Sequence, residues 1–207
     1  MKGVYLPPEV AIPGIDEFAE AITHAFSDAL KPGDFPKLIV ESGRALIAVV
    51  DDGEGMGRAE LALAIERHAT SKLQGDDLLQ IDTLGFRGEA LPSIGAVARL
   101  TIASRMRDSE PAEIKVDGGR LEGPRPAAFL ASGQHGTRAE VRELFYATPA
   151  RLKFLKSARS EELAIVDMVK RLTMARPDIA FSLVMDGRKS LDLEAEPDLM
   201  DGRLPRL

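Results

Sequence analysis

The stretch that decides the fold is residues 83–100, TLGFRGEALPSIGAVARL. Gly85 and Gly88 bracket a Phe-Arg pair, and Glu89 then opens an apolar run with helical spacing. Glycines beside a helix start let backbone N–H groups approach a phosphate without a Cβ atom in the way, and the helix adds the positive end of its dipole. On this chemistry alone, the stretch is one weak anion-binding candidate among many glycine-containing turns.

A second candidate lies upstream, where an apolar strand ends in DDGEGM at residues 51–56. The Asp51 carboxylate can accept a hydrogen bond from an exocyclic amine such as adenine N6. Gly53 and Gly55 let the backbone lie against a flat base. Taken alone, the segment is better explained as a β-turn, because Asp-Gly is a common turn signal.

Four strings in this order resemble the MutL family of DNA mismatch-repair ATPases, part of the class that also holds gyrases, heat-shock chaperones and histidine kinases. GFRGEALPSI (85–94) resembles the family's ATP lid, and few other families combine GFRGEAL with a following Ser-Ile. DDGEGM resembles its Asp-x-Gly-x-Gly adenine motif, and RHATSKL (67–73) resembles the next segment. GTRAEVRELFYATPARLKFLKS (136–157) resembles its Gly-Thr strand and Pro-Ala-Arg helix start. The resemblance runs from about residue 47 to residue 157, and more loosely to the C-terminus.

The resemblance implies an adenine-nucleotide pocket. In the family, the residue matching Asp51 contacts adenine, the two glycines shape the pocket floor, and Met56 lines it. The hydroxyl of Thr137 helps to bind the adenine region, and the lid offers backbone N–H groups to the phosphates. The full set that the resemblance assigns to the nucleotide is Asp51, Gly53, Gly55, Met56, Thr70, Ser71, Lys72, Gly85, Phe86, Arg87, Gly88, Glu89, Ala90, Leu91 and Thr137.

Several of these assignments have ordinary alternatives. Thr70, Ser71 and Lys72 follow a predicted helix, and an exposed helix end would look the same, since a lone lysine is usually a solvated charge. Arg87 could bind a phosphate or pair with a lid carboxylate. Gly-Thr at 136–137 would suit a turn before a strand.

The N-terminal helix departs from the family pattern. In the family, one helix carries a Glu that activates water, an Asn four positions later that binds Mg²⁺, and an Asp-Ala pair three positions after that. Alignment on Glu20 places His24 at the magnesium position, with one extra residue before Asp28. Alignment on Asp28 places Ala21 at the base position and Ala25 at the metal position. Neither register restores both groups, and imidazole suits softer metals than Mg²⁺.

We therefore assign Glu20 as the candidate general base and His24 as the candidate metal ligand, with ATP and Mg²⁺ as the implied cofactors. Three explanations of residues 9–45 stay open: a divergent homologue, a shifted reading frame, or an altered chain. A smaller departure is Ala147, where the family usually has Asn.

Helices and strands are intermixed without regular βαβ repeats, which favours an α+β fold. We expect a two-layer sandwich in which helices cover a mixed, mostly antiparallel sheet, as in the Bergerat-type ATP-binding fold. The apolar periods predict helices over 15–30, 60–68 and 161–175. They predict strands over 38–41, 45–50, 97–104, 113–116, 138–141, 179–185 and 190–193, with a turn-rich region over 111–136.

The length and composition of the chain limit the classes of protein to which it could belong. The 207 residues suit one ATP-binding domain over 1–207, with an extended arm over 1–14. The transducer and dimerisation domains of the family would be absent. The chain has no cysteine and no apolar run of transmembrane length, so we expect a soluble cytoplasmic protein without a membrane partner. A net charge of −6 argues against a strong intrinsic nucleic-acid surface.

The leading interpretation is the ATP-binding domain of a MutL-like mismatch-repair protein, acting as a nucleotide-driven conformational and dimerisation switch. Its implied partners are ATP, the mismatch-recognition protein, DNA and, in the full-length protein, a second copy in an ATP-dependent homodimer. One alternative is a degenerate interaction module that binds the nucleotide without hydrolysing it. Another is the catalytic domain of a histidine kinase, which GFRGEAL and PARLKFLKS count against.

Overall fold

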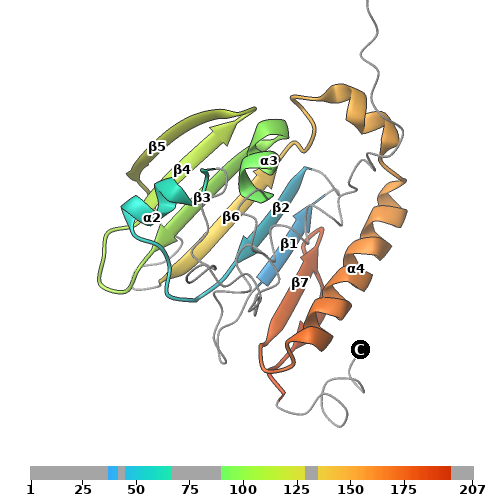
Figure 1. Cartoon of the computed structure of the whole chain (residues 1–207). Helices are drawn as coiled ribbons and strands as arrows, with labels where there is room; N and C mark the ends of the chain where they lie inside the picture. Colours follow the sequence, from blue (N-terminus) through green and yellow to red (C-terminus); the bar gives the residue numbers. More distant parts are fainter. Residues whose placement is uncertain (1–36, 42–44, 67–89, 129–134, 197–207) are drawn as a thin grey trace, which may run out of the picture.

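A computed structural model describes residues 37–41, 45–66, 90–128 and 135–196. One eight-stranded sheet, in the order β5-β4-β3-β6-β2-β1-β7-β8, runs through this part of the chain (Figure 1). The strands are β1 (Lys37–Glu41), β2 (Leu46–Val50), β3 (Arg99–Arg105), β4 (Ala112–Asp117), β5 (Arg120–Pro126), β6 (Gly136–Arg142), β7 (Phe181–Met185) and β8 (Arg188–Leu193). The helical elements are α2 (Arg58–Leu63), α3 (Ala90–Val97), the 3₁₀ helix η1 (Pro149–Phe154) and α4 (Ala158–Ala175).

The sheet is antiparallel except where β1 pairs with β7 in parallel. β1 and β2, which match two of the predicted strands, form a hairpin, with Leu38 opposite Val49 and Val40 opposite Ile47. β7 and β8, at the last two predicted strands, form a second hairpin. The expected α+β class with a mostly antiparallel sheet covered by helices is confirmed.

Strand β5 lies where the sequence predicted only turns. It is an edge strand, and nearly all of its side chains are exposed. An edge strand without a buried face carries no alternation of apolar and polar residues, so the usual signal is missing. Its register with β4 also shifts between Glu113 and Lys115.

Two helix boundaries differ from the predicted ones. α2 begins at Arg58 and ends at Leu63, with turn residues rather than helix over 64–66, whereas the pattern predicted 60–68. α4 begins three residues before the predicted Glu161, because the Ser157 hydroxyl caps it by accepting a hydrogen bond from the Ser160 N–H at 3.2 Å. Among the described residues, no helix has the length and hydropathy needed to cross a membrane.

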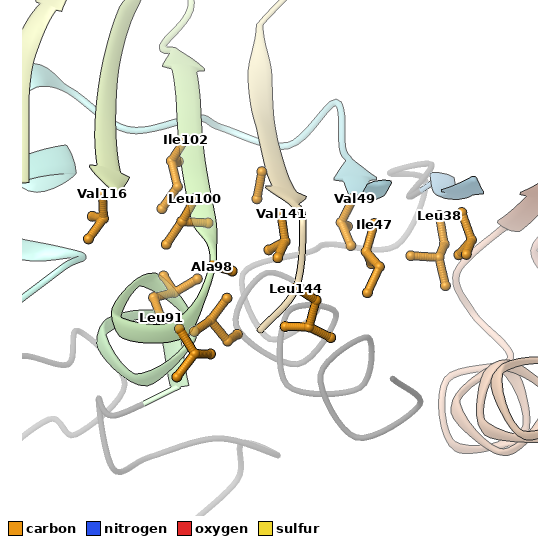
Figure 2. Packing of buried hydrophobic residues seen from close by; sticks show 14 of the residues in the cluster. Leu38, Ile47, Val49, Leu91, Ala98, Leu100, Ile102, Val116, Val141 and Leu144 are labelled. Carbon is orange, nitrogen blue, oxygen red and sulfur yellow. The ribbon is translucent and has the colours of Figure 1, made fainter. Parts of the chain in front are cut away.

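The helices cover one face of the sheet and bury its core there. α2 contacts β4 and β5, α3 contacts β3 and β4, and α4 contacts β7. Figure 2 shows the row of sheet side chains, from Val116 through Leu100 and Val141 to Leu38, that faces Leu91 and Leu144. Each fully buried side chain of this kind contributes about 1.5–3 kcal/mol relative to exposure.

Helix α3 is held close to the sheet by Gly95. A Cβ at this position would lie 2.8 Å from Val116 Cγ1 on β4, so only glycine permits the approach. The Gly119 N–H donates to the Gly95 carbonyl at 2.9 Å, and the Gly118 N–H donates to the Ala98 carbonyl at 3.2 Å. The turn between β4 and β5 therefore clamps the end of the helix that follows the glycine-rich stretch.

Candidate nucleotide site

Asp51 stands at the end of β2 with its carboxylate already oriented by the backbone. The residue is buried, at 8% exposure. Its Oδ1 accepts one hydrogen bond from the Gly53 N–H and another from the Thr137 N–H, each at 3.0 Å. The Asp51 N–H donates to the Thr137 carbonyl at 2.9 Å. A carboxylate fixed through Oδ1 is a preorganised hydrogen-bond acceptor.

Thr137 lies on β6 next to Asp51, so the structure brings together two residues that are far apart in the sequence. Gly136 makes this contact possible. Its φ is +119°, and a Cβ there would lie 2.1 Å from the Asp51 carbonyl oxygen. The Gly-Thr pair is therefore required by the close passage of two backbones and not by a simple turn.

Ser104 at the end of β3 completes the arrangement and was not singled out from the sequence. Its side chain is fully buried, and its Oγ lies 2.8 Å from Thr137 Oγ1. It also accepts a hydrogen bond from the Met56 N–H at 2.7 Å. We call Asp51, Ser104, Thr137 and the backbone of Met56 the strand-end junction. A signal existed, since Ser104 continues the inward-facing series begun by two apolar residues of β3.

The loop after Asp51 is fixed at several points. Gly55 has a φ of +72°, and a Cβ on it would lie 2.1 Å from the Arg105 carbonyl oxygen. Met56 packs against the core. His135 holds the loop from the other side, because its Nδ1 lies 2.7 Å from the Gly53 carbonyl oxygen.

The bond pattern of His135 identifies its tautomer. Its Nε2 lies 3.0 Å from Arg107 Nη2, and a guanidinium can only donate. Nε2 is therefore the acceptor, and Nδ1 carries the proton that is donated to Gly53. His135 was also not singled out from the sequence, where a histidine beside a Gly-Thr pair carries no distinctive signal.

Ala90 and Leu91 are the two lid residues within the described part of the chain. They form the first turn of α3, where the backbone N–H groups have no partner within the helix. The Leu91 side chain points into the core, so only its backbone is available to a phosphate. The other assigned residues lie outside the described part: Glu20, His24, Thr70, Ser71, Lys72, Gly85, Phe86, Arg87, Gly88 and Glu89.

The Pro-Ala-Arg segment forms η1, with Pro149 in its first turn as expected for a helix start. Thr148 precedes it without a side-chain cap. The Thr148 hydroxyl is buried and has no hydrogen-bond partner among the described residues. In this part of the chain, no group of three or more His, Cys, Asp or Glu side chains could hold a metal ion.

Comparison with known proteins agrees with this geometry. The chain is 52% identical over 196 residues to the DNA mismatch repair protein MutL of Azorhizobium caulinodans, covering 93% of this chain and 31% of that protein. It is 51% identical over 219 residues to MutL of Phenylobacterium zucineum, covering 98% of this chain and 35% of that protein. The chain thus spans about a third of the length of these relatives. No protein-family model matches it.

A solved structure shows the same architecture. The ATPase domain of Aquifex aeolicus MutL, solved in complex with ADP, superposes with a TM-score of 0.68 at 26% identity, over 90% of this chain and 65% of that one. The fold therefore places the chain in the ATPase class of gyrases, heat-shock chaperones, histidine kinases and MutL. Within that class, the chain belongs to the MutL family of DNA mismatch-repair proteins.

Proposed function

We propose that this chain binds ATP as the nucleotide-binding domain of a MutL-like mismatch-repair protein, with the base seated against the strand-end junction. The observation that carries the proposal is the buried Asp51 carboxylate, which two backbone N–H groups orient through Oδ1. The similarity to the ADP-bound MutL ATPase domain supports it.

The chemistry of the junction favours adenine over guanine. A carboxylate can accept from the exocyclic amine of adenine, whereas it would repel the O6 carbonyl of guanine at the same place. Leaving such a buried acceptor unpaired costs more than the bond itself gains, so the wrong base is rejected. Gly53, Gly55 and Met56 would form the floor beside the base.

The phosphates would lie toward α3. The N–H groups of its first turn, which have no partner within the helix, and its dipole both favour an anion. The clamp at Gly95 holds α3 against the sheet, so the helix start has a fixed place relative to Asp51. The lid residues Gly85 to Glu89, with Thr70, Ser71 and Lys72, would complete the phosphate contacts, and ordering of the lid would be the conformational switch.

Hydrolysis is a separate part of the proposal. It would need a general base, for which Glu20 is the candidate, and Mg²⁺, for which His24 is the candidate ligand. Phosphate release should be measured for the purified chain and for Glu20→Ala. Turnover that Glu20→Ala abolishes would support Glu20 as the base. Binding without turnover in both proteins would favour the non-hydrolysing module, and turnover insensitive to Glu20 would assign the base elsewhere, with Glu17 the next candidate.

The domain boundaries and partners follow from the family and are also proposals. The chain would act as one ATP-binding domain with an N-terminal arm, inside a longer cytoplasmic protein that dimerises when it binds ATP. The mismatch-recognition protein and DNA would be partners of that whole protein. Analytical ultracentrifugation with and without a non-hydrolysable ATP analogue tests whether this chain dimerises by itself.

The test of nucleotide binding uses Asp51→Asn. The amide oxygen can still accept from Gly53 and Thr137, so the fold is kept, but the second oxygen is replaced by a donor. Calorimetry should show ATP binding weakened by about 1–3 kcal/mol. Asp192→Asn on the edge strand β8 is the matched control, since it makes the same change three strands away from β2 and should leave the affinity unchanged. Equal affinity of Asp51→Asn and the unaltered chain would refute the assignment.

A further inference from the structure

We propose that Ser104 is a positioning residue that sets the proton of the Thr137 hydroxyl and thereby the purine edge that the site accepts. The inference rests on the proposed binding of an adenine nucleotide at Asp51. In the bound state, Ser104 donates its proton to Thr137 Oγ1. Thr137 then donates its own proton to an acceptor on the base, directly or through one water, beside the amine held by Asp51.

The Ser104 hydroxyl can donate its proton to one acceptor at a time. The hydroxyl has one proton and two acceptor lone pairs. The Met56 N–H at 2.7 Å can only donate, so it uses one lone pair. Two acceptors compete for the single proton: the Gly136 carbonyl oxygen at 3.1 Å and Thr137 Oγ1 at 2.8 Å. The direction of the Ser104–Thr137 hydrogen bond is therefore decided by what Thr137 meets on its other side.

Two arrangements satisfy this count. In the first, Thr137 donates to Ser104 and Ser104 donates to the Gly136 carbonyl, which leaves Thr137 as an acceptor only. In the second, the Met56 N–H donates to Ser104, Ser104 donates to Thr137, and Thr137 is free to donate. The second forms a chain of donors in one direction, and each bond in such a chain polarises the next.

The hydrogen-bonding edge of adenine matches the second arrangement, in which Thr137 donates. On adenine, the ring nitrogen N1 is an acceptor next to the N6 amine, so a carboxylate and a hydroxyl donor match the two positions. On guanine, both positions are reversed, because O6 accepts and the N1–H donates. Ser104 thus makes Thr137 a donor at the place where adenine needs one, and it acts on the N1 position of the base through Thr137.

The burial of Ser104 supports a role beyond packing. The two preceding inward-facing residues of β3, Leu100 and Ile102, are fully buried apolar side chains. A hydroxyl in that series loses its hydration and must be compensated by hydrogen bonds. Within the described part of the chain, its hydrogen bonds go to the loop that follows Asp51 and to the start of β6. The Ser104 hydroxyl therefore connects the parts of the strand-end junction and does not hold the apolar core together.

The experiment compares three nucleotides by calorimetry on the purified chain: ATP, 1-deaza-ATP, which lacks the N1 acceptor, and 7-deaza-ATP, which changes the opposite edge. The unaltered chain should bind ATP and 7-deaza-ATP similarly and 1-deaza-ATP about two- to tenfold more weakly, the range for one hydrogen bond. Thr137→Val should abolish that preference. Ser104→Ala should reduce it, and Ser104→Ala combined with Thr137→Val should show no further loss of it.

A merely structural Ser104 would give a different result. Ser104→Ala would then weaken ATP and 1-deaza-ATP equally, and its effect would add to that of Thr137→Val; either outcome overturns the inference. Thr173→Ala is the control for loss of a buried hydroxyl, since Thr173 Oγ1 donates to the Lys170 carbonyl within α4, away from the junction. It should leave the preference intact. If Ser104→Ala does not fold, Ser104→Cys keeps the volume with a weaker donor.

The same measurements distinguish a failure of nucleotide binding at Asp51 from a failure of the role of Ser104. If the unaltered chain does not bind ATP, or if Asp51→Asn binds it equally well, the proposed function fails. If ATP binds through Asp51 but 1-deaza-ATP binds as tightly, only the role of Ser104 fails.

Discussion

The two ends of strand β3 use polar groups in opposite ways. At one end, Ser104 is fully buried and takes part in the strand-end junction. At the other end, Arg99 is half-exposed, lies 3.7 Å from the Asp117 carboxylate, pairs with Glu143 and stacks over the Tyr146 ring at 4.8 Å from its centroid. Each end has three partners, but at the charged end water competes for all of them. Burial, and not the number of contacts, decides which end is sensitive to change.

The largest expected effect is at the buried end. Gly136→Ala would place a Cβ 2.1 Å from the Asp51 carbonyl oxygen in a residue with a φ of +119°. Because the obstacle is backbone, the strands must separate, and we expect a loss of at least about 3 kcal/mol in the free energy of unfolding. Urea unfolding measures it.

The matched control is Gly187→Ala. Gly187 also has a positive φ, +75°, but a Cβ there meets nothing within 4 Å. It should lose only about 1–2 kcal/mol from backbone strain. Similar losses for the two variants would mean that the close passage at Gly136 does not matter.

The next effect concerns the hydroxyl pair. Thr137→Val keeps the shape of the side chain but leaves Ser104 with one partner fewer in a buried place. The free energy of unfolding should fall by about 1–2 kcal/mol. An unchanged denaturant midpoint for Thr137→Val would show that the buried end is no more sensitive than a surface.

A smaller effect is expected at the exposed end. Arg99→Met keeps the apolar stem over Tyr146 and removes the charge. The side chains of Arg99, Asp117 and Glu143 are all at least 50% exposed, so the loss should stay below about 1 kcal/mol. It should shrink further in 1 M salt, where such pairs are screened. A loss as large as that of Thr137→Val would erase the contrast between the two ends.

The smallest effect is at Asp192 on β8. The hydrogen bond from Lys189, at 2.6 Å, holds the pKa of the Asp192 carboxyl below its usual value. A lowered pKa in the folded state gives stability that is present above the unfolded pKa, near 4, and is lost as the pH falls through the folded value. The denaturant midpoints of the unaltered chain and Asp192→Asn should differ slightly at pH 6 and converge as the pH falls through the folded pKa of Asp192. A difference between the two midpoints that grows as the pH falls would contradict a lowered pKa of Asp192.

Much of the fold could be predicted because its strands carry local signals. The hairpins β1–β2 and β7–β8 follow from apolar runs around short turns, and α4 follows from its period. Strand β5 could not be predicted, because an exposed edge strand is not patterned by burial.

The site divides in the same way. In the sequence, Asp51 and Thr137 lie in two separate motifs. The two residues could be linked because both motifs resemble those of one family. The hydrogen bond that joins them, and the participation of Ser104 and His135, depend on strands that pair across long stretches of sequence. A single serine or histidine gives no sign of such a partner until the register of β3 against β6 is known.

The parallel pairing of β1 with β7 has a consequence for synthesis of the protein. On β1, Lys37 to Val40 pair with Ser182 to Met185 on β7. An early strand therefore cannot complete its pairing until one of the last described strands has been synthesised. Pairings this distant in sequence raise the contact order and slow folding. While the ribosome is still making the middle of the chain, β1 has only β2 on one side and an open edge on the other. That edge is the natural place for a chaperone to protect the nascent chain, or for two nascent chains to pair wrongly.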